Sequence, residues 1–435
     1  MNPVTVGILG IFLLFLLLAM RMQIGLSMVI VGFLGFGVLN ALKPSFFILG
    51  MEPFKIGTAY SLTVIPRFIL MGQFANHSRM GFEFYQTVYR WIGFLPGGLS
   101  MATIAACGGF AAISGSSLAA AATMGMVALP EMKRFKYDDA LATGCIAAGG
   151  TLGILIPPST VMIIYGILTE QPIATLFIAG VAPGILLTLL FILTVYLMTR
   201  IKPALGPPGP HFPLKQKIYS LKDTWSILTL FVLVIGGLYT GWFTPTEASG
   251  VGAFGAFMIT IIKKKLTWEN LTDSLAQTVR TTAMVFLILI GANIFGYFLT
   301  ISQIPDQLSV LTAEAGLNRY VVLALLVLAY IILGCFMEGM AIMVLTIPIV
   351  YPMVLELGFD PIWFGIIITL VMEMSLISPP VGMNVFIISG IAKEVPMYKI
   401  FRGVLPFWVA MLVCIILLIL FPQLAMFLPQ TMSGY

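Results

Sequence analysis

Residues 147–159 read AAGGTLGILIPPS, an apolar run interrupted by the adjacent prolines Pro157 and Pro158. Each proline removes a backbone donor and clashes with the preceding helical turn, so a helix must break here. Inside a bilayer an unpaired backbone group is costly, and such a break is tolerated only where it is buried in protein or lines a wet cavity. Residues 377–381, ISPPV, contain a second doubled proline within an apolar run. A simple proline kink is the alternative, and the recurrence of a doubled proline beside a hydroxyl argues against it.

The composition around these breaks is that of a membrane protein. Of the 435 residues, 60% are hydrophobic and 9% are charged, and the mean hydropathy is +1.06, whereas soluble domains carry about 25% charged residues. The apolar residues form continuous runs, while a transmembrane β-barrel needs alternating polarity. We therefore predict an all-α polytopic membrane protein. The candidate spans are residues 4–20, 23–42, 56–76, 138–168, 173–199, 225–243, 246–262, 281–300, 361–392 and 403–428.

Two further apolar stretches, residues 97–130 and 320–357, have a polar or glycine-rich middle and are predicted to be re-entrant helical hairpins. If each hairpin returns to the side from which it enters and the N-terminus lies outside, most of the 22 Lys and Arg residues fall on one side of the membrane. All then lie inside except Lys43, Lys55, Arg319 and the intramembrane Arg67, as the positive-inside rule requires. The proline-rich residues 202–222 become a cytoplasmic linker rather than a packed element.

The two halves of the chain show an internal repeat. A shift of 222 residues pairs Pro130 with Pro352, Asp138 with Asp360, and the two Pro-Pro steps with each other, and one more residue pairs 180–183 with 403–406. Because the hairpins open to opposite sides, the predicted repeat is inverted, which places a binding site near the midplane. The expected parts are scaffold helices and an arm (1–96), a first repeat core (97–199), the linker (200–224), further scaffold helices and a second arm (225–318), and a second repeat core (319–435).

Each hairpin tip is expected to face a broken helix and to form one small ion-binding cage. Free carbonyls favour cations and half-helix N-termini favour anions. Close helix packing by small residues is the alternative for the glycines. The predicted first cage comprises Ser114, Gly115, Ser116, Ser117, Gly153, Pro157, Pro158 and Ser159. The predicted second cage comprises Gly334, Glu338, Gly339, Ser378, Pro379, Pro380, Met383 and Asn384.

Carboxylates within membrane spans are costly and invite a functional explanation. Glu338 and Glu373 could each bind a cation, carry a proton, or pair with a buried base such as Arg67. Asp138 and Asp360 each follow a loop and precede a long helix, so we predict that they cap helices.

Enzymatic chemistry has few candidate residues. His77 and His211 fall in predicted loops, so no Ser-His pair or His-ligated metal is expected. The four cysteines are spaced singly and are interpreted as small core residues. No phosphate-binding Gly-Lys-Ser/Thr loop occurs, which argues against ATP hydrolysis by this chain. No cofactor and no metal beyond a coupling ion are predicted. The function that remains after these exclusions is transport driven by an ion gradient.

With these motifs the chain resembles the large membrane subunit of tripartite ATP-independent periplasmic (TRAP) transporters, the DctM-like family. The resemblance is densest at residues 113–117, 147–159 and 378–386, and residues 65–72, IPRFILMG, resemble a further family run. Arg67 departs from it where an apolar residue is usual. Ser378 replaces a Thr and keeps its hydroxyl, whereas Ala120 replaces a Thr and loses it.

The resemblance implies an elevator-type carrier of the ion-transporter superfamily that uses sodium to import an organic acid, a C4-dicarboxylate or a similar carboxylate. It implies two partners, a small four-helix membrane subunit and a periplasmic solute-binding protein, and a bacterial inner membrane with a periplasmic N-terminus. The alternatives are a stand-alone sodium/dicarboxylate symporter of the same superfamily, an ion channel or a non-transporting scaffold. A membrane enzyme is the most distant.

Overall fold

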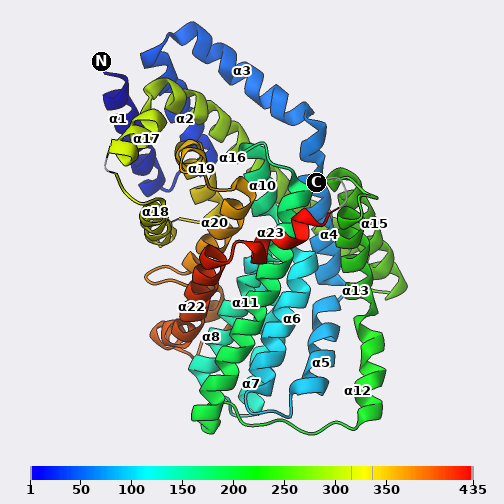
Figure 1. Ribbon diagram of the computed structural model, residues 1–435. Coiled ribbons are helices and arrows are strands. Elements are labelled where there is room, and N and C mark those ends of the chain that lie inside the picture. Colours follow the sequence, from blue (N-terminus) through cyan, green and yellow to red (C-terminus); the bar gives the residue numbers. More distant parts are fainter. Residues whose placement is uncertain (1, 315, 336, 433–435) are drawn as a thin grey trace.

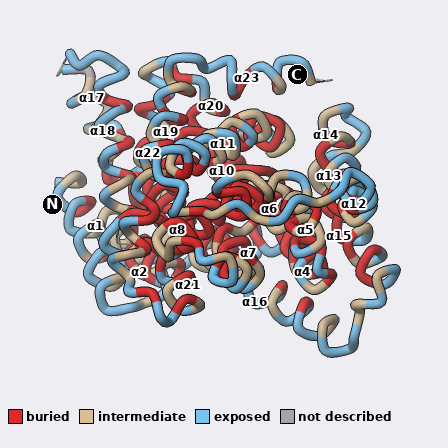
Figure 2. The backbone as a smooth tube through the Cα atoms, turned by 90° about the horizontal axis from the view of Figure 1, so that it is seen from below, coloured by how far each residue is buried: buried red, intermediate tan, exposed pale blue. Residues whose placement is uncertain are grey.

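The computed structural model describes residues 2–314, 316–335 and 337–432, which form helices and irregular segments without a strand (Figure 1). Six helical runs in these ranges are long and apolar enough to cross a membrane, and a bent pair would make a seventh. The prediction of an all-α polytopic protein is confirmed. Buried residues gather along the central helices, and exposed residues lie mostly around the periphery (Figure 2).

The N-terminal helices α1 (Pro3–Ala19) and α2 (Ile24–Leu39) pack against α16 (Trp268–Ser302). Helix α3 (Leu42–Thr58) extends away from them as an arm (Figure 1). A short turn η1 (Tyr60–Thr63) then leads into α4 (Val64–His77). The expected span 56–76 is therefore wrong at its start, because the extended residue Ala59 separates two helices. The charged residues of α3 hid this helix from a hydropathy pattern.

Helices α4 and α15 (Pro245–Ile262) pack together, and α5 (Met80–Ile92) continues from α4. Helix α12 (Leu214–Ser220) leads through η3 (Leu221–Thr224) into α13 (Trp225–Phe231), a π-helical segment η4 (Val232–Gly236) and α14 (Gly237–Tyr239).

The expectation of an unpacked linker over residues 202–222 is wrong in two ways. Residues 214–220 are helical, since no proline follows Pro213. The preceding turn η2 (Pro203–Leu205) is tied to the core, because the Leu205 carbonyl accepts from Asp138 N at 3.0 Å and the Gly206 carbonyl accepts from Gly97 N at 2.8 Å.

The same two hydrogen bonds show how the first hairpin is arranged. Its arms are α6 (Gly98–Ser114) and α7 (Ser117–Arg134). Gly97 begins the first arm and Asp138 follows the second, so both ends of the hairpin lie beside one segment of chain. The hairpin therefore returns to the end from which it starts.

The predicted break in the following helix is confirmed. Helices α8 (Asp139–Gly150) and α9 (Leu152–Leu155) are bent by 41° from α10 (Thr160–Leu168). Helix α11 (Ile173–Ile201) then runs back along the first hairpin.

Before the second hairpin lies α17 (Ile304–Glu314), which none of the candidate spans covers, and α16 begins thirteen residues before the expected span at 281. The second hairpin comprises α18 (Arg319–Gly334) and α19 (Gly339–Glu356). Its ends also meet, because the Arg319 guanidinium lies 5.6 Å from the centroid of the Phe359 ring. The second broken helix comprises α20 (Pro361–Ser375) and α21 (Met383–Ile391).

The expected final span, 403–428, is two helices, α22 (Met397–Leu420) and α23 (Gln423–Gln430). Helix α22 ends before Phe421, the residue that precedes Pro422, because proline disfavours a helical conformation in the residue before it. Helix α23 then crosses α11 toward the C-terminus (Figure 1).

Helix α22 shows that the two broken helices run in opposite directions. Near its start, Lys399 Nζ contacts Asp139 Oδ2 of α8 at 3.3 Å, while near its end the Leu418 carbonyl accepts from Trp363 Nε1 of α20 at 2.9 Å. These contacts lie at opposite ends of a 24-residue helix, which is about 36 Å long. The predicted inverted repeat requires this arrangement. The duplication itself and the domain boundaries stay predictions.

The two helix caps expected before the broken helices are both present. Asp138 Oδ1 accepts from the backbone N–H groups of Ala140 and Leu141 at 3.0 and 3.1 Å. Asp360 Oδ1 accepts from Trp363 N at 2.8 Å. Each carboxylate satisfies donors that the first helical turn leaves unpaired.

Candidate functional site

The tip of the first hairpin is two residues long. Gly115 ends α6 with φ +60°, a conformation that a residue with a Cβ adopts only under strain. Ser116 is extended and begins α7, where its Oγ accepts from Ala119 N at 3.4 Å. The chain thus reverses direction by a left-handed glycine followed directly by an N-cap serine.

The first tip packs tightly against the first helix break. A Cβ on Gly153 of α9 would lie 2.6 Å from the Ser116 carbonyl oxygen, and a Cβ on Gly115 would lie 2.9 Å from the Pro158 carbonyl oxygen. Thr160 Oγ1 donates to the Gly115 carbonyl at 3.4 Å. These contacts bring the residues predicted for the first cage together around one backbone crossing.

Other members of that set have local roles. Pro157 and Pro158 are buried and are joined by a cis peptide bond. Ser159 is 1% exposed, and its Oγ accepts from Met162 N at 3.3 Å, so this hydroxyl caps α10. Ser114 lies at the end of α6, and its buried Oγ has no hydrogen-bond partner among the residues that the structure describes.

The second tip also faces its helix break, but its contacts run through the side chains of Cys335 and Ser375 rather than through a crossing of two backbones. Cys335 Sγ donates to the Pro379 carbonyl at 3.0 Å, and Gly334 packs against Ser375. Gly339 approaches only Met372, whose Cβ would lie 3.5 Å from an added Cβ. Pro379 and Pro380 are exposed, unlike their counterparts, although they too are joined by a cis peptide bond.

Three residues predicted for the second cage point elsewhere. Ser378 Oγ donates to the Met374 carbonyl at 2.8 Å and accepts from Trp408 Nε1 at 2.9 Å. Asn384 Nδ2 donates to the Ala147 carbonyl of α8 at 3.1 Å, so this side chain joins the two broken helices. Met383 is 36% exposed.

One cavity of about 50 Å³ lies where the two tips meet. A site for one water needs about 10–15 Å³, so this cavity has room for about four water-sized guests. Its walls come from both tips, from the segments flanking the first break, and from the end of α20. They comprise Gly115, Ser116, Ser117, Leu118, Ile154, Thr160, Val161, Glu338, Gly339, Met340, Met372, Glu373 and Leu376.

Two carboxylates face this cavity. Glu373 is 1% exposed, and Ser117 Oγ lies 2.7 Å from each of its carboxylate oxygens, so one hydroxyl joins the first tip to α20. Glu338 lies at the start of α19 and lines the cavity from the second tip. Within the described ranges neither carboxylate forms an ion pair.

Arg67 is not the partner of either carboxylate, so the alternative of pairing with this base is wrong. Its Nη1 donates to the Thr246 carbonyl at 3.0 Å, near the start of α15. A carboxylate buried without a cation is costly, and oxygen ligands around a small cavity suit a hard cation. The arrangement can therefore bind a small cation.

The sequence pattern missed several residues of this site. Thr160, Met340 and Met372 line the cavity, and Cys335 and Trp408 hold the second break. Thr160 directly follows Ser159, so its position beside the break was the one available signal. The contribution of Trp408 depends on packing between helices distant in sequence.

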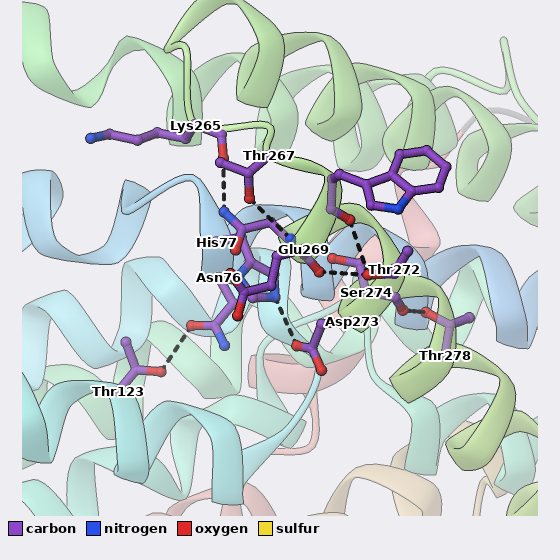
Figure 3. Close-up of polar contacts among 12 residues, drawn as sticks. Asn76, His77, Thr123, Lys265, Thr267, Glu269, Thr272, Asp273, Ser274 and Thr278 are labelled. Carbon is purple, nitrogen blue, oxygen red and sulfur yellow. Dashed lines mark hydrogen bonds and ion pairs between the residues drawn. The ribbon is translucent and has the colours of Figure 1, made fainter.

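A polar cluster away from the tip cavity joins the first hairpin to neighbouring helices (Figure 3). Thr123 Oγ1 of α7 donates to Asn76 Oδ1 of α4 at 3.1 Å, and His77 Nε2 lies 3.1 Å from Asp273 Oδ2 of α16. His77 is the last residue of α4 rather than a loop residue, whereas His211 lies in an irregular segment as expected. Among the described residues no cluster of three His, Cys, Asp or Glu side chains could hold a metal ion.

Residues 11–424 match the family described as the tripartite ATP-independent periplasmic transporter, DctM component. The chain belongs to this family. It is a TRAP transporter large permease and a multi-pass membrane protein, and the resemblance seen in its motifs is confirmed. Its relatives are transport permeases, which fits a protein that is not an enzyme.

Curated relatives cover nearly the whole chain. The C4-dicarboxylate TRAP transporter large permease protein DctM of Pseudomonas aeruginosa is 36% identical over 88% of this chain and 89% of the relative. The sialic acid large permease SiaM of Vibrio cholerae is 31% identical, over 86% and 88%. The ectoine/5-hydroxyectoine large permease UehC of Ruegeria pomeroyi is 30% identical, over 85% and 86%.

Two solved transporters share the fold at low sequence identity. MtrF of Neisseria gonorrhoeae matches with a TM-score of 0.59 and 12% identity over 88% of this chain and 84% of that chain. YdaH of Alcanivorax borkumensis matches with a TM-score of 0.56 and 14% identity, over 90% and 88%. These likenesses support the helical transporter fold alone.

Proposed function

We propose that this TRAP large permease imports an organic acid and draws the energy from a sodium gradient. The observation that carries this proposal is the cavity between the two hairpin tips, where Ser117 and Glu373 meet. The relatives named for a C4-dicarboxylate, sialic acid and ectoine support an organic solute.

The sodium ions bind around the two tips in this proposal. Gly115 and Ser116 offer backbone carbonyls beside the first break, and the Ser117 hydroxyl and the carboxylates of Glu373 and Glu338 offer oxygen ligands in the cavity. A bound cation would offset the cost of burying Glu373. The cavity has room for an ion with a few waters, so the organic solute is bound between the predicted cages only after the tips have moved apart.

An elevator movement is the proposed way of changing access. The hairpins and broken helices form the moving part, and α1–α4 with α13–α16 form the scaffold. The bond between Thr123 of α7 and Asn76 of α4 joins these two parts, so it must break during the movement.

Two partners are part of the proposal. The isethionate TRAP permease DctMQ of Oleidesulfovibrio alaskensis is covered over only 58% of its length by this chain, while 85% of this chain is matched. A further segment in that relative fits a small membrane subunit, so we propose such a subunit as a partner of this permease, with a periplasmic solute-binding protein delivering the solute. The membrane is then the bacterial inner membrane, with the N-terminus in the periplasm.

The test is uptake into proteoliposomes that contain this chain, the small subunit and the binding protein loaded with its solute. Ser117→Ala and Glu373→Gln each remove an oxygen ligand or a charge from the cavity, so we expect sodium dependence to weaken by at least about tenfold, the value of one lost charge-assisted contact. Ser302→Ala is a control, because Ser302 is a buried serine that does not line the cavity: its Oγ donates to the Leu299 carbonyl and accepts from Ile304 N at 3.4 Å. Unchanged sodium dependence in both cavity variants would contradict the proposal, and uptake without the binding protein would favour a stand-alone symporter.

A further inference from the structure

A second and larger cavity lies outside the tip site. This outer cleft has a volume of about 590 Å³, within the range of small-molecule sites. Its walls come from the end of α3 with η1, from the end of α10, and from α16 and α19. Its polar side chains are Lys55, Ser61, Glu170, Asn293, Tyr297 and Thr300.

The outer cleft and the tip cavity share two helices. Helix α10 lines the tip cavity with Thr160 and the cleft with Ile167, and α19 lines them with Gly339 and Pro348. At 1.5 Å per helical residue the two sites are separated by about 10–14 Å. The far end of α10 lies where the second hairpin opens, because Tyr165 Oη donates to the Pro361 carbonyl at 2.6 Å. The cleft is thus at the end predicted to face the periplasm.

A buried carboxylate organises one wall of the cleft. Glu52 of α3 is fully buried and accepts from Asn293 Nδ2 at 2.9 Å and from Tyr297 Oη at 3.0 Å. Lys55 Nζ lies 3.8 Å from Glu52 Oε1, and its side chain is 61% exposed. Glu52 therefore fixes the orientation of two side chains on α16 and holds the ammonium group near the rim.

This arrangement decides which polar groups remain for a ligand. The Tyr297 hydroxyl donates its hydrogen bond to Glu52, so toward a ligand its oxygen can only accept a hydrogen bond. The Asn293 amide uses one N–H on Glu52, and its carbonyl oxygen stays available. Thr300 Oγ1 donates to the Gly296 carbonyl and can also accept, and Glu170 adds an exposed carboxylate. The second Asn293 N–H and the Ser61 hydroxyl can still donate, so the cleft offers one cationic donor, two neutral donors and a larger number of acceptor oxygens.

We propose that the outer cleft binds the solute before it reaches the tip cavity, and that it selects a small molecule with one carboxylate and several N–H or O–H donors. The carboxylate pairs with Lys55, and the donors face Asn293, Tyr297 and Glu170. A dicarboxylate without such donors leaves these acceptors unpaired and sets its second charge against Glu170, which disfavours it. This inference rests on the proposed import of an organic acid and narrows its solute class.

The test measures binding to the purified full-length chain in detergent, without a sodium gradient, by saturation-transfer NMR, which detects weak ligands. The probes are succinate, which has two carboxylates, 4-aminobutyrate, which has a carboxylate and an ammonium group, and gluconate, which has a carboxylate and hydroxyls. We expect a saturation-transfer signal from 4-aminobutyrate or gluconate and no signal from succinate.

Two cleft variants and one control locate the binding. Lys55→Ala and Asn293→Ala each remove one contact and should weaken binding about tenfold, the value of a charge-assisted hydrogen bond. Lys43→Ala is the control, because Lys43 is an exposed lysine at the start of the same helix. The Lys55 side chain is largely exposed, so Lys55→Ala is expected to fold. This variant therefore still tests the cleft if Asn293→Ala fails to fold.

Equal binding of succinate, binding unchanged in both cleft variants, or no binding of any probe would each overturn the inference. These results are separable from the test of the tip cavity. Loss of sodium dependence in Ser117→Ala and Glu373→Gln with no effect of the cleft variants on binding would reject the cleft alone. The reverse pattern would reject sodium coupling at the tips and keep the cleft.

Discussion

The two helix breaks share a doubled proline but have different surroundings. Pro157 and Pro158 are buried beneath the first tip, whereas Pro379 and Pro380 are exposed beside the second. The first tip has a backbone crossing closed by Gly153, and the second tip touches its break through Cys335. A doubled proline therefore determines that a helix breaks, and the packing of the facing hairpin determines whether the break is closed or open.

The largest expected effect tests the closed crossing. In Gly153→Ala the new Cβ meets the Ser116 carbonyl at 2.6 Å, so the tip must move or the crossing must open. Overpacking of this kind costs about 1–3 kcal/mol, and we expect uptake to fall at least about tenfold. Gly339→Ala at the second tip is the comparison variant, because its new Cβ meets only Met372 Cβ at 3.5 Å, an ordinary contact, and it should keep most uptake. Equal losses in the two variants would show that the crossings are equally tight.

Thiol labelling tests the open break. Cys335 is partly exposed and contacts Pro379, whereas Cys107, Cys145 and Cys414 are fully buried. We expect a membrane-permeant maleimide to label Cys335 at least about tenfold faster than the other three, because local opening must precede reaction at a buried thiol. Mass spectrometry of the labelled peptides measures the rates, and Cys335→Ser should abolish the fast phase. Equal rates at all four thiols would mean that the second break is as closed as the first.

A smaller effect is expected from the only tryptophan that contacts Ser378 among the described residues. Trp408→Phe removes the indole N–H that donates to Ser378 Oγ, while the Met374 carbonyl still accepts from that hydroxyl. One neutral hydrogen bond is worth about 1 kcal/mol, so the thermal midpoint in detergent should fall by a few degrees. Trp242→Phe is the control, because Trp242 is 80% exposed. An unchanged midpoint in Trp408→Phe would show that this bond does not stabilise the open break.

The smallest effect concerns an exposed pair that joins the two repeat cores. Lys133 at the end of α7 donates to Glu394 Oε2 at 2.8 Å, and this hydrogen bond and the ammonium charge lower the pKa of the Glu394 carboxyl. Because the folded pKa is lowered, the stabilisation is present above the ordinary glutamate pKa of about 4.3 and is lost as the pH falls through the lowered value. Thermal midpoints measured from pH 7 to pH 3 should drop slightly less for Glu394→Gln than for the parent. Parallel curves would contradict a role for this pair.

Local features of the chain predicted the parts of the site that depend on neighbouring residues. The break at Pro157, the tip at Gly115 and Ser116, and the caps at Asp138 and Asp360 all follow from backbone donors and allowed dihedral angles. The family motifs were also readable, and the family membership is confirmed.

Features that depend on contacts between distant residues were not predicted. Helices α3 and α17 lack a continuous apolar signal. Pairing with Arg67 was one of the alternatives for Glu338 and Glu373, but Arg67 donates to the Thr246 carbonyl. Asn384 was expected to face the second tip and instead reaches Ala147 of the other broken helix.

The sequence by itself determined that this protein is a helical membrane permease with two proline-broken helices and two hairpins, because apolar run length, proline and glycine act on the backbone locally. Only the tertiary structure decided that both tips share one cavity, that Ser117 donates to Glu373, and that Glu52 orients the outer cleft. Those partners are separated by some 240–260 positions in the chain, and the distance between them is set by the packing of whole helices rather than by any local pattern.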